Sequence, residues 1–320
     1  MQLSPKEEYM SVRGRLSILA SMAMVVAACT GGGATTPPAS SGTAASQPAT
    51  SSESSPPSSA ASAAPIAGGL LEKILKAGKL VVSTDPKYPP QSELQPDGTY
   101  KGFDIDVATE VAKRLGVTVE FTTPDWTAIT AGGWGGRWDV SVGSMTITVD
   151  RKKVLDFSPP YYYTPAQMAA STHSGITTMD GLAGKTICSG ESTTYDQWLN
   201  GKLDYGTGQD LGKPPAGIKT VTLPTDTDCP DQWKSKRYDF DGWLSSITTV
   251  DGAIKAGLPV VKIGAPVYFE PLAVAVDKSG PPDTDFLPLL TSIVNDMHSD
   301  GTLTALSQKS YGADFTIAAK

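Results

Sequence analysis

The chain has 320 residues, of which 39% are hydrophobic and 18% charged, as expected of a globular protein with one or two packed cores. Its formal net charge is −7, and no Lys/Arg-rich run is interleaved with aromatic residues, which argues against a nucleic-acid-binding protein. Neither His173 nor His298 lies near a second ligand at a metal-binding spacing. We therefore predict no metal centre and no cofactor.

The N-terminal segment is typical of an export signal. Three basic residues precede an apolar stretch, 16–28, that is too short to span a bilayer as a permanent helix. The stretch ends in Val-Ala-Ala-Cys at 26–29, which resembles a bacterial lipobox, where the cysteine receives a diacylglyceryl group. We expect residues 1–28 to be a lipoprotein signal peptide and Cys29 to be lipidated. An ordinary secretory signal with a chance cysteine is the alternative.

The next segment, up to residue 67, is almost wholly Ser, Ala, Pro, Thr and Gly, with Glu53 as its only charge. Such a composition cannot build a core. We expect residues 29–67 to be a lipid anchor and disordered linker, with a reach on the order of 35 Å. A glycosylated stalk or a simple spacer would behave similarly.

The first half of the globular part alternates helices and strands. An amphipathic helix over 70–76 is followed by a strand over 80–82. A second helix follows residue 106, with its apolar positions on one face, and Gly116 stops it. The strand 117–121 comes next.

The same rhythm recurs in the second half, which predicts two sheets of the βαβ kind. Strand-like segments over 164–171 and 264–276 lie between the two rhythms, so we interpret them as crossings between two lobes. The C-terminal helices are expected to return to the first lobe. The predicted elements are strand 185–188, helix 193–199, strand 218–223, helix 231–236, strand 238–243, helix 247–256, and the C-terminal helices 286–297 and 302–309.

Three motifs in order resemble one known family. They are Gly-Phe-Asp-Ile-Asp-Val at 102–107, Thr-Ile-Thr-Val-Asp-Arg-Lys-Lys-Val-Leu-Asp-Phe-Ser at 146–158, and Asp85 followed by Tyr-Pro-Pro at 88–90. Over residues 70–315 the chain resembles the family 3 solute-binding proteins, the polar-amino-acid receptors of ABC transporters.

The resemblance implies an α/β, two-lobed fold of the periplasmic-binding-protein type (type II), each lobe a mostly parallel sheet flanked by helices. We expect lobe 1 to comprise 68–168 plus 269–320 and lobe 2 to comprise 169–268, with hinges near 169–171 and 267–271. The resemblance implies an extracytoplasmic, membrane-anchored receptor, expected to be a monomer, that captures an amino acid or related carboxylate-bearing solute. Closure about the hinges would present the loaded form to the membrane subunits of an ABC importer.

Candidate ligand-binding residues follow predicted strands, where open α/β sheets bind ligands. Arg151 offers a planar fork for a carboxylate, Asp85 offers an anion for an ammonium, and Tyr88 and Trp126 offer flat walls. The resemblance adds five further positions: Ser144, Thr146, and the helix-start turn formed by Ser192, Thr193 and Thr194.

Each role has a simpler alternative. Arg151 may be read as a surface base in a basic run, Asp85 as a turn residue before Pro86, and Trp126 as a core residue. Asp104 and Asp106 are best interpreted as structural residues at a helix start.

The chain departs from the family pattern in lobe 2. Relatives carry an aspartate there that holds the ligand ammonium, but here Leu244 or Ser246 stands at that place. The remaining partners for an amine are Asp85 and Asp241, and Ser246 remains a candidate ligand contact. The ligand is therefore an amino acid held differently, or a solute with a modified or absent amine.

Two cysteines are predicted to form a disulfide. Cys188 ends one strand of lobe 2, and Cys229 follows the neighbouring strand 218–223. An oxidising exterior permits the bridge, which would contribute about 3–4 kcal/mol by restricting the unfolded chain. Two buried thiols are the alternative.

Two other functions stay open: a lyase of the cyclohexadienyl dehydratase type and a ligand-sensing receptor subunit. A lyase needs a general acid in the cleft. Glu93 and Glu191 are the only glutamates near the predicted ligand turns, and neither belongs to a catalytic motif, so we predict a binding protein rather than an enzyme.

Overall fold

The computed structural model describes residues 65–318, so the predicted signal peptide, Cys29 and most of the linker lie outside the described residues. The helices are α1 (Leu70–Ala77), α2 (Phe103–Arg114), α3 (Trp126–Thr130), α4 (Thr194–Leu199), α5 (Asp228–Lys234), α6 (Ile247–Lys255), α7 (Phe286–Ser299) and α8 (Thr302–Tyr311). The strands are β1 (Lys79–Ser83), β2 (Lys87–Tyr88), β3 (Ser92–Leu94), β4 (Tyr100–Lys101), β5 (Thr118–Thr122), β6 (Val140–Thr146), β7 (Leu155–Ser171), β8 (Thr186–Gly190), β9 (Lys219–Leu223), β10 (Gly242–Ser246), β11 (Val260–Lys262) and β12 (Tyr268–Asp277). Within this part of the chain, no helix has the length and apolar character needed to cross a membrane.

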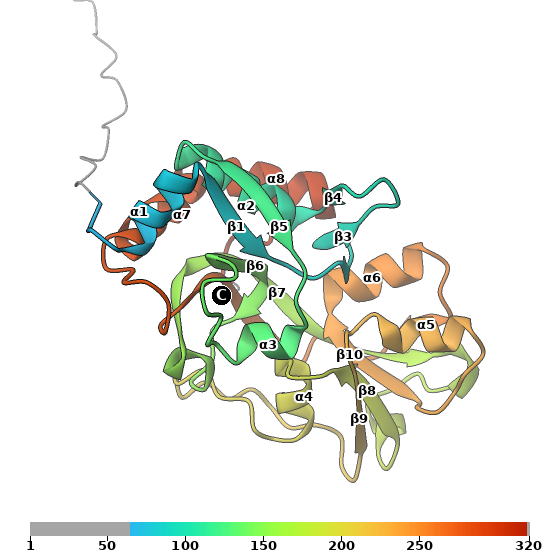
Figure 1. Cartoon of the computed structure of the whole chain (residues 1–320). Helices are drawn as coiled ribbons and strands as arrows, with labels where there is room; N and C mark the ends of the chain where they lie inside the picture. Colours follow the sequence, from blue (N-terminus) through green and yellow to red (C-terminus); the bar gives the residue numbers. More distant parts are fainter. Residues whose placement is uncertain (1–64, 319–320) are drawn as a thin grey trace, which may run out of the picture. The chain divides into compact units, whose positions relative to one another are not determined.

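The main sheet has two parallel ends joined by an antiparallel centre (Figure 1). Its order is β5-β1-β6-β12-β7-β10-β8-β9. β1 pairs in parallel with β5 and β6, and β8 pairs in parallel with β9 and β10, while β12 and β7 run antiparallel between the two groups. The fold is thus α/β and two-lobed. Lobe 1 contains β1, β5 and β6 with α1–α3, α7 and α8, and lobe 2 contains β8, β9 and β10 with α4–α6.

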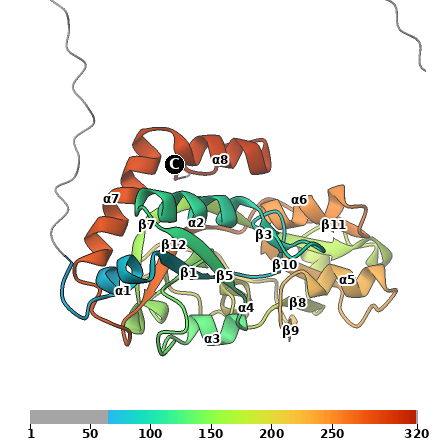
Figure 2. The ribbon, with the colours of Figure 1, turned by 45° about the horizontal axis from the view of Figure 1, so that its top comes forward.

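Lobe 1 has a core on each face of its sheet. On one face α1, α2, α7 and α8 bury apolar side chains such as Phe103, Val107 and Phe286 against β1 and β6. On the other face α3 and the segment before β6 bury Ile129, Trp134 and Trp138. Figure 2 shows α2, α7 and α8 on one side of the strands and α3 on the other. The apolar face predicted for the second helix is confirmed by its buried residues.

Gly102 explains why its motif begins with glycine. Its φ is 130°, and a Cβ there would lie 2.2 Å from the carbonyl oxygen of Gln91. The close approach lets the first amides of α2, those of Phe103 and Asp104, donate to the carbonyls of Pro90 and Gln91. The motif therefore fixes the Tyr88–Gln91 segment against the start of α2.

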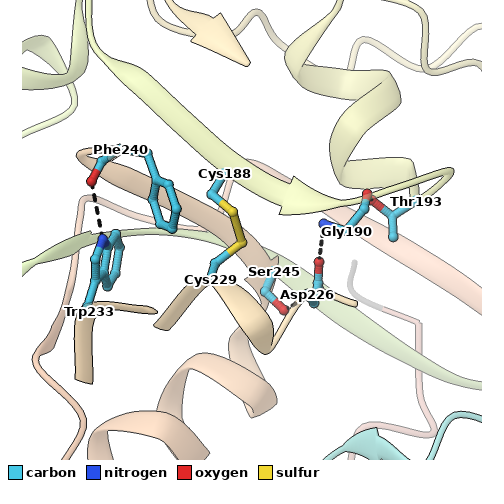
Figure 3. Close-up of a disulfide and its surroundings, with 8 residues drawn as sticks. All are labelled: Cys188, Gly190, Thr193, Asp226, Cys229, Trp233, Phe240 and Ser245. Carbon is cyan, nitrogen blue, oxygen red and sulfur yellow. Dashed lines mark hydrogen bonds between the residues drawn. A yellow bond between two sulfur atoms is a disulfide. The ribbon is translucent and has the colours of Figure 1, made fainter. Parts of the chain in front are cut away.

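In lobe 2 a disulfide joins the two cysteines named from the sequence: Cys188 in β8 bonds Cys229 in α5, with Cα atoms 6.0 Å apart. The bridge lies beside Phe240 and Trp233 (Figure 3), whose ring centroids are 5.4 Å apart with the ring planes tilted by 44°. Both cysteines are fully buried within this aromatic cluster.

The predicted strand over 238–243 is wrong in its position, because β10 begins only at Gly242. The preceding residues are held otherwise: the Tyr238 ring stacks on His173 at 4.0 Å, and the carbonyl of Phe240 accepts a hydrogen bond from the indole of Trp233. The first crossing segment is longer than the predicted 164–171, whereas the second, β12, has 10 residues and is shorter than the predicted 264–276. β7 has 17 residues and pairs with β12, so the two expected sheets form one continuous ladder.

Candidate functional site

A small cavity of about 40 Å³ lies where strands of both lobes end. Its walls come from the carboxyl ends of β1, β6, β8 and β9, the position at which open α/β sheets bind ligands. The lining residues are Asp85, Tyr88, Trp126, Gly143, Ser144, Thr146, Arg151, Thr193, Thr194, Tyr195, Pro224, Thr225, Asp226 and Glu270.

Arg151 reaches this cavity from the 3-10 turn η1 (Arg151–Lys153) and is only 4% exposed, so it is no surface base. Its Nη1 donates to the carbonyl of Thr146 at 2.9 Å and its Nη2 to that of Ser192 at 3.0 Å. The buried Nε has no partner within residues 65–318. Burial lowers the pKa of Arg151 to about 10, so the guanidinium stays charged at neutral pH.

Trp126 and Tyr88 form part of the cavity wall. The Arg151 guanidinium carbon lies 5.4 Å from the Trp126 ring centre, within range of a cation–π contact. The Tyr88 hydroxyl meets that of Tyr195 across the cavity at 3.1 Å, and burial raises the pKa of Tyr88.

Ser144 lines the cavity, but both its amide and its hydroxyl already donate hydrogen bonds to other residues of the protein. It sits at the end of β6 with a φ of 55°, and its amide donates to the Tyr161 hydroxyl at 3.0 Å. Its hydroxyl donates to Asp104 Oδ2 at 2.7 Å and lies 2.6 Å from the Tyr162 hydroxyl. A ligand that binds the Ser144 hydroxyl, as predicted, would have to compete with Asp104 and Tyr162 for it. The Ser144 carbonyl makes none of these hydrogen bonds.

Three carboxyls line the cavity. Asp85 accepts from the Lys87 amide at 2.7 Å and from the Thr225 hydroxyl at 3.1 Å, and burial raises its pKa. Asp85 is therefore both a turn residue before Pro86, the simpler alternative given above, and a residue that lines the cavity.

Asp226 lies three residues after the end of β9 and is 3% exposed. Its Oδ1 accepts from the Gly190 amide at 2.7 Å and its Oδ2 from the Ser245 hydroxyl at 2.6 Å (Figure 3). Burial outweighs these two hydrogen bonds and raises the pKa of Asp226 to about 7.

Glu270 lies on β12 and is 1% exposed. Its Oε1 accepts from the hydroxyls of Thr146, at 2.8 Å, and Thr194, while its buried Oε2 has no partner in the described part of the chain. Burial raises the pKa of Glu270, although the hydroxyls and the positive charge of Arg151 oppose the shift.

The structure does not bring every predicted residue to the cavity wall. Ser192 contacts Arg151 through its carbonyl instead. Asp241 precedes β10, at the opposite strand end from the cavity, and accepts from the Thr186 amide at 3.2 Å. Ser246 is a buried cap of α6 and accepts from the amide group of Gln91 at 3.1 Å.

Sequence reasoning missed Asp226, Glu270 and Tyr195. Asp226 lies just after a strand, so the rule that found Asp85 applies to it equally. Glu270 could not be found from the sequence, because it is distant in the chain from Thr146 and Thr194. It comes close to them only when β12 pairs with β7.

The two lobes touch around the cavity. Gln91 Nε2 donates from lobe 1 toward hydroxyls of α6 in lobe 2, at 2.8 Å for Thr248 and 3.3 Å for Thr249. The Thr227 hydroxyl of α5's cap donates to the Lys87 carbonyl at 2.6 Å. The described arrangement is therefore closed.

Comparisons with known proteins agree with this architecture. Residues 80–313 match the bacterial extracellular solute-binding proteins, family 3. The chain is 30% identical over 252 residues to the L-cystine-binding protein TcyJ of Escherichia coli (strain K12), covering 78% of this chain and 88% of that one. The protein belongs to the family 3 extracellular solute-binding proteins.

Solved structures of similar fold are also amino-acid-binding proteins. A mutant of ArgBP from T. maritima superposes with a TM-score of 0.65 at 26% identity, covering 76% of this chain and 99% of that one. The ancestral amino acid-binding protein AncCDT-1, a precursor of cyclohexadienyl dehydratase, gives 0.63 at 29% identity, covering 75% and 99%.

Proposed function

We propose that this protein is an extracytoplasmic receptor that captures an amino acid, or a related carboxylate-bearing solute, in the interlobe cavity and delivers it to an ABC importer. Its ligand-binding residues are Asp85, Tyr88, Trp126, Thr146, Arg151, Thr193, Thr194, Asp226 and Glu270. Membership of the family and the relatives named for binding cystine and arginine support this function.

The observation that carries the proposal is the pairing of unlike charges in one buried cavity. Arg151 and Glu270 each keep one buried polar atom without a partner in residues 65–318. Buried polar atoms are normally paired, so their presence favours a ligand that supplies the missing partners. A free amino acid carries both an anion for Arg151 and a cation for a carboxyl.

A thermal-shift screen of the purified protein against amino acids and their derivatives tests the proposal. A ligand present at 100 times its Kd adds about 2.7 kcal/mol to the folded state and raises Tm by about 5–10 °C. We expect such a rise for at least one amino acid. A flat profile across all carboxylate-bearing solutes would contradict the proposal.

The lipid anchor and linker expected over residues 29–67 belong to the same proposal. Lipidation of Cys29 would hold the receptor, as a monomer, at the outer face of the cell membrane beside the transporter subunits. Mass spectrometry of the mature protein should find a chain that begins at a diacylated Cys29, and a Cys29→Ala variant should be released from membranes.

A lyase is the second candidate, favoured by Glu270. A buried carboxyl with a raised pKa is the general acid that the elimination of water requires, and it lies in the cavity. AncCDT-1 is named as a precursor of such an enzyme. Incubation with prephenate or arogenate discriminates the two: we expect no product, and steady turnover lost in Glu270→Gln would favour the lyase.

A further inference from the structure

The cavity carries an excess of negative groups. Among its lining residues Arg151 is the one base, while Asp85, Asp226 and Glu270 are acids, which gives a formal charge of −2 when all three acids are ionised. A ligand with equal numbers of ammonium and carboxylate groups would leave that charge in place.

Within residues 65–318 none of these carboxyls forms a salt bridge with a protein cation, although the charge of Arg151 lowers the pKa of Glu270 and that of Lys87 lowers the pKa of Asp85. Asp85 and Asp226 are each held by one amide and one hydroxyl, and Glu270 by two hydroxyls. The Nζ of Lys87, two residues from Asp85, pairs instead with Asp228 at 3.5 Å. The three acids therefore have only neutral hydrogen-bond donors, and a bound cation would add a direct charge–charge attraction.

An acidic hollow of about 380 Å³, here called the mouth, adjoins the cavity. It shares Asp85, Trp126, Pro224 and Thr225 with the cavity. Its other charged residues are Asp125, Glu191, Asp228 and Lys87. Asp85 thus stands between the cavity and the mouth, whereas Asp226 and Glu270 border the cavity alone.

We propose that the ligand is an amino acid with a positively charged side chain. The inference rests on the proposed function and narrows its substrate class. Arg151 takes the α-carboxylate, the inner acids Asp226 and Glu270 take the α-ammonium, and Asp85 takes the side-chain cation. Tyr88 and Trp126 line the same cavity as Asp85 and would offer aromatic faces to the side chain. Asp226 would thereby take the place of the lobe 2 aspartate that relatives use for the ammonium and that Ser246 replaces here.

Calorimetric titration with matched ligands tests the inference. L-Arginine and L-citrulline have nearly the same shape, but citrulline has a neutral side chain. We expect L-arginine or L-lysine to bind about tenfold or more tightly than citrulline. Asp85→Asn, which keeps the acceptor for the Lys87 amide, should remove most of this preference. Asp239→Asn changes a 69% exposed acid beside Arg237 and should leave the preference unchanged.

The outcomes separate the inference from the proposed function. If citrulline, glutamine or cystine binds as tightly as the basic amino acids, the inference is wrong and the receptor function stands. An unchanged preference in Asp85→Asn, with Tm retained, would also overturn it. If no amino acid of any charge binds, the proposed function itself fails.

Discussion

Asp104 lies in the N-terminal turn of α2, as predicted for a helix-start residue, but its hydrogen bonds are to residues outside the helix. It is fully buried and accepts from the hydroxyls of Tyr161 and Ser144, both at 2.7 Å. It thereby orients Ser144 in the cavity wall. Asp106 takes the simpler role, pairing with Lys309 of α8 at 2.7 Å.

Asp104 should make the stability of the protein depend on pH. Burial raises its pKa to about 7, whereas an unfolded aspartate titrates near about 3.9. Between these values the folded state binds the extra proton, so the free energy of unfolding falls as the pH rises toward 7. From pH 5.5 to 7.5 the loss should be about 2 kcal/mol for this group.

Urea unfolding of the wild type and of Asp104→Asn at the two pH values measures the effect. The variant lacks the titrating group, so its stability should change less between them. An identical pH dependence in both proteins would rule out Asp104 as a source. The residual dependence should come from the other buried acids, among them Asp226 and Glu270, whose pKa values burial also raises.

Single residues of the site could be predicted where they lie in a local motif that follows a strand. Arg151, Asp85 and Thr146 meet this condition, and they line the cavity. Glu270 does not, because its hydroxyl partners Thr146 and Thr194 belong to distant parts of the chain. A motif specifies neighbours in sequence, whereas burial of a carboxyl depends on tertiary pairing.

At the level of elements, the disulfide joins β8 to α5 across a sequence separation of 41 residues. Loop-closure entropy for a loop of this length gives a stabilisation of about 4 kcal/mol. The double variant Cys188→Ala/Cys229→Ala should lose about this much free energy of unfolding. Reductant should destabilise the wild type similarly and leave the double variant unaffected. Two alkylatable thiols in the non-reduced protein would contradict the bridge.

Helices and parallel strands could be predicted because their apolar periodicity is local. β10 could not be placed correctly, since Phe240 and Tyr238 suggest strand character but pack against Trp233 and His173. The ladder starts at Gly242, where a Cβ would lie 2.6 Å from Ile187 Cδ1. Tertiary packing therefore sets this boundary rather than intrinsic propensity.

At the level of the whole molecule, Gln91 links the two lobes. Its side-chain amide faces the hydroxyls of Ser246, Thr248 and Thr249, and its two hydrogens can satisfy two of them at a time. These bonds exist only when the lobes are closed. Gln91 therefore contributes to the closed-state free energy without lining the cavity.

Gln91→Ala should shift the population toward open forms. Losing these bonds should weaken ligand binding about tenfold, because part of the binding energy is then spent on closure. Small-angle X-ray scattering of the ligand-free variant should give a larger radius of gyration than the wild type. Gln308→Ala, an exposed change on α8, is the control. Equal affinities and equal radii would show that Gln91 does not govern closure.

The central claim is that Arg151 grips the carboxylate of an amino acid between the lobes. Calorimetric titration of wild type, Arg151→Lys and Arg151→Ala with the best amino acid from the thermal screen measures it directly. We predict about 100-fold or greater weakening for Arg151→Ala and a smaller loss for Arg151→Lys, which keeps the charge but not the fork. A folded Arg151→Ala protein that binds with the wild-type Kd would contradict the claim.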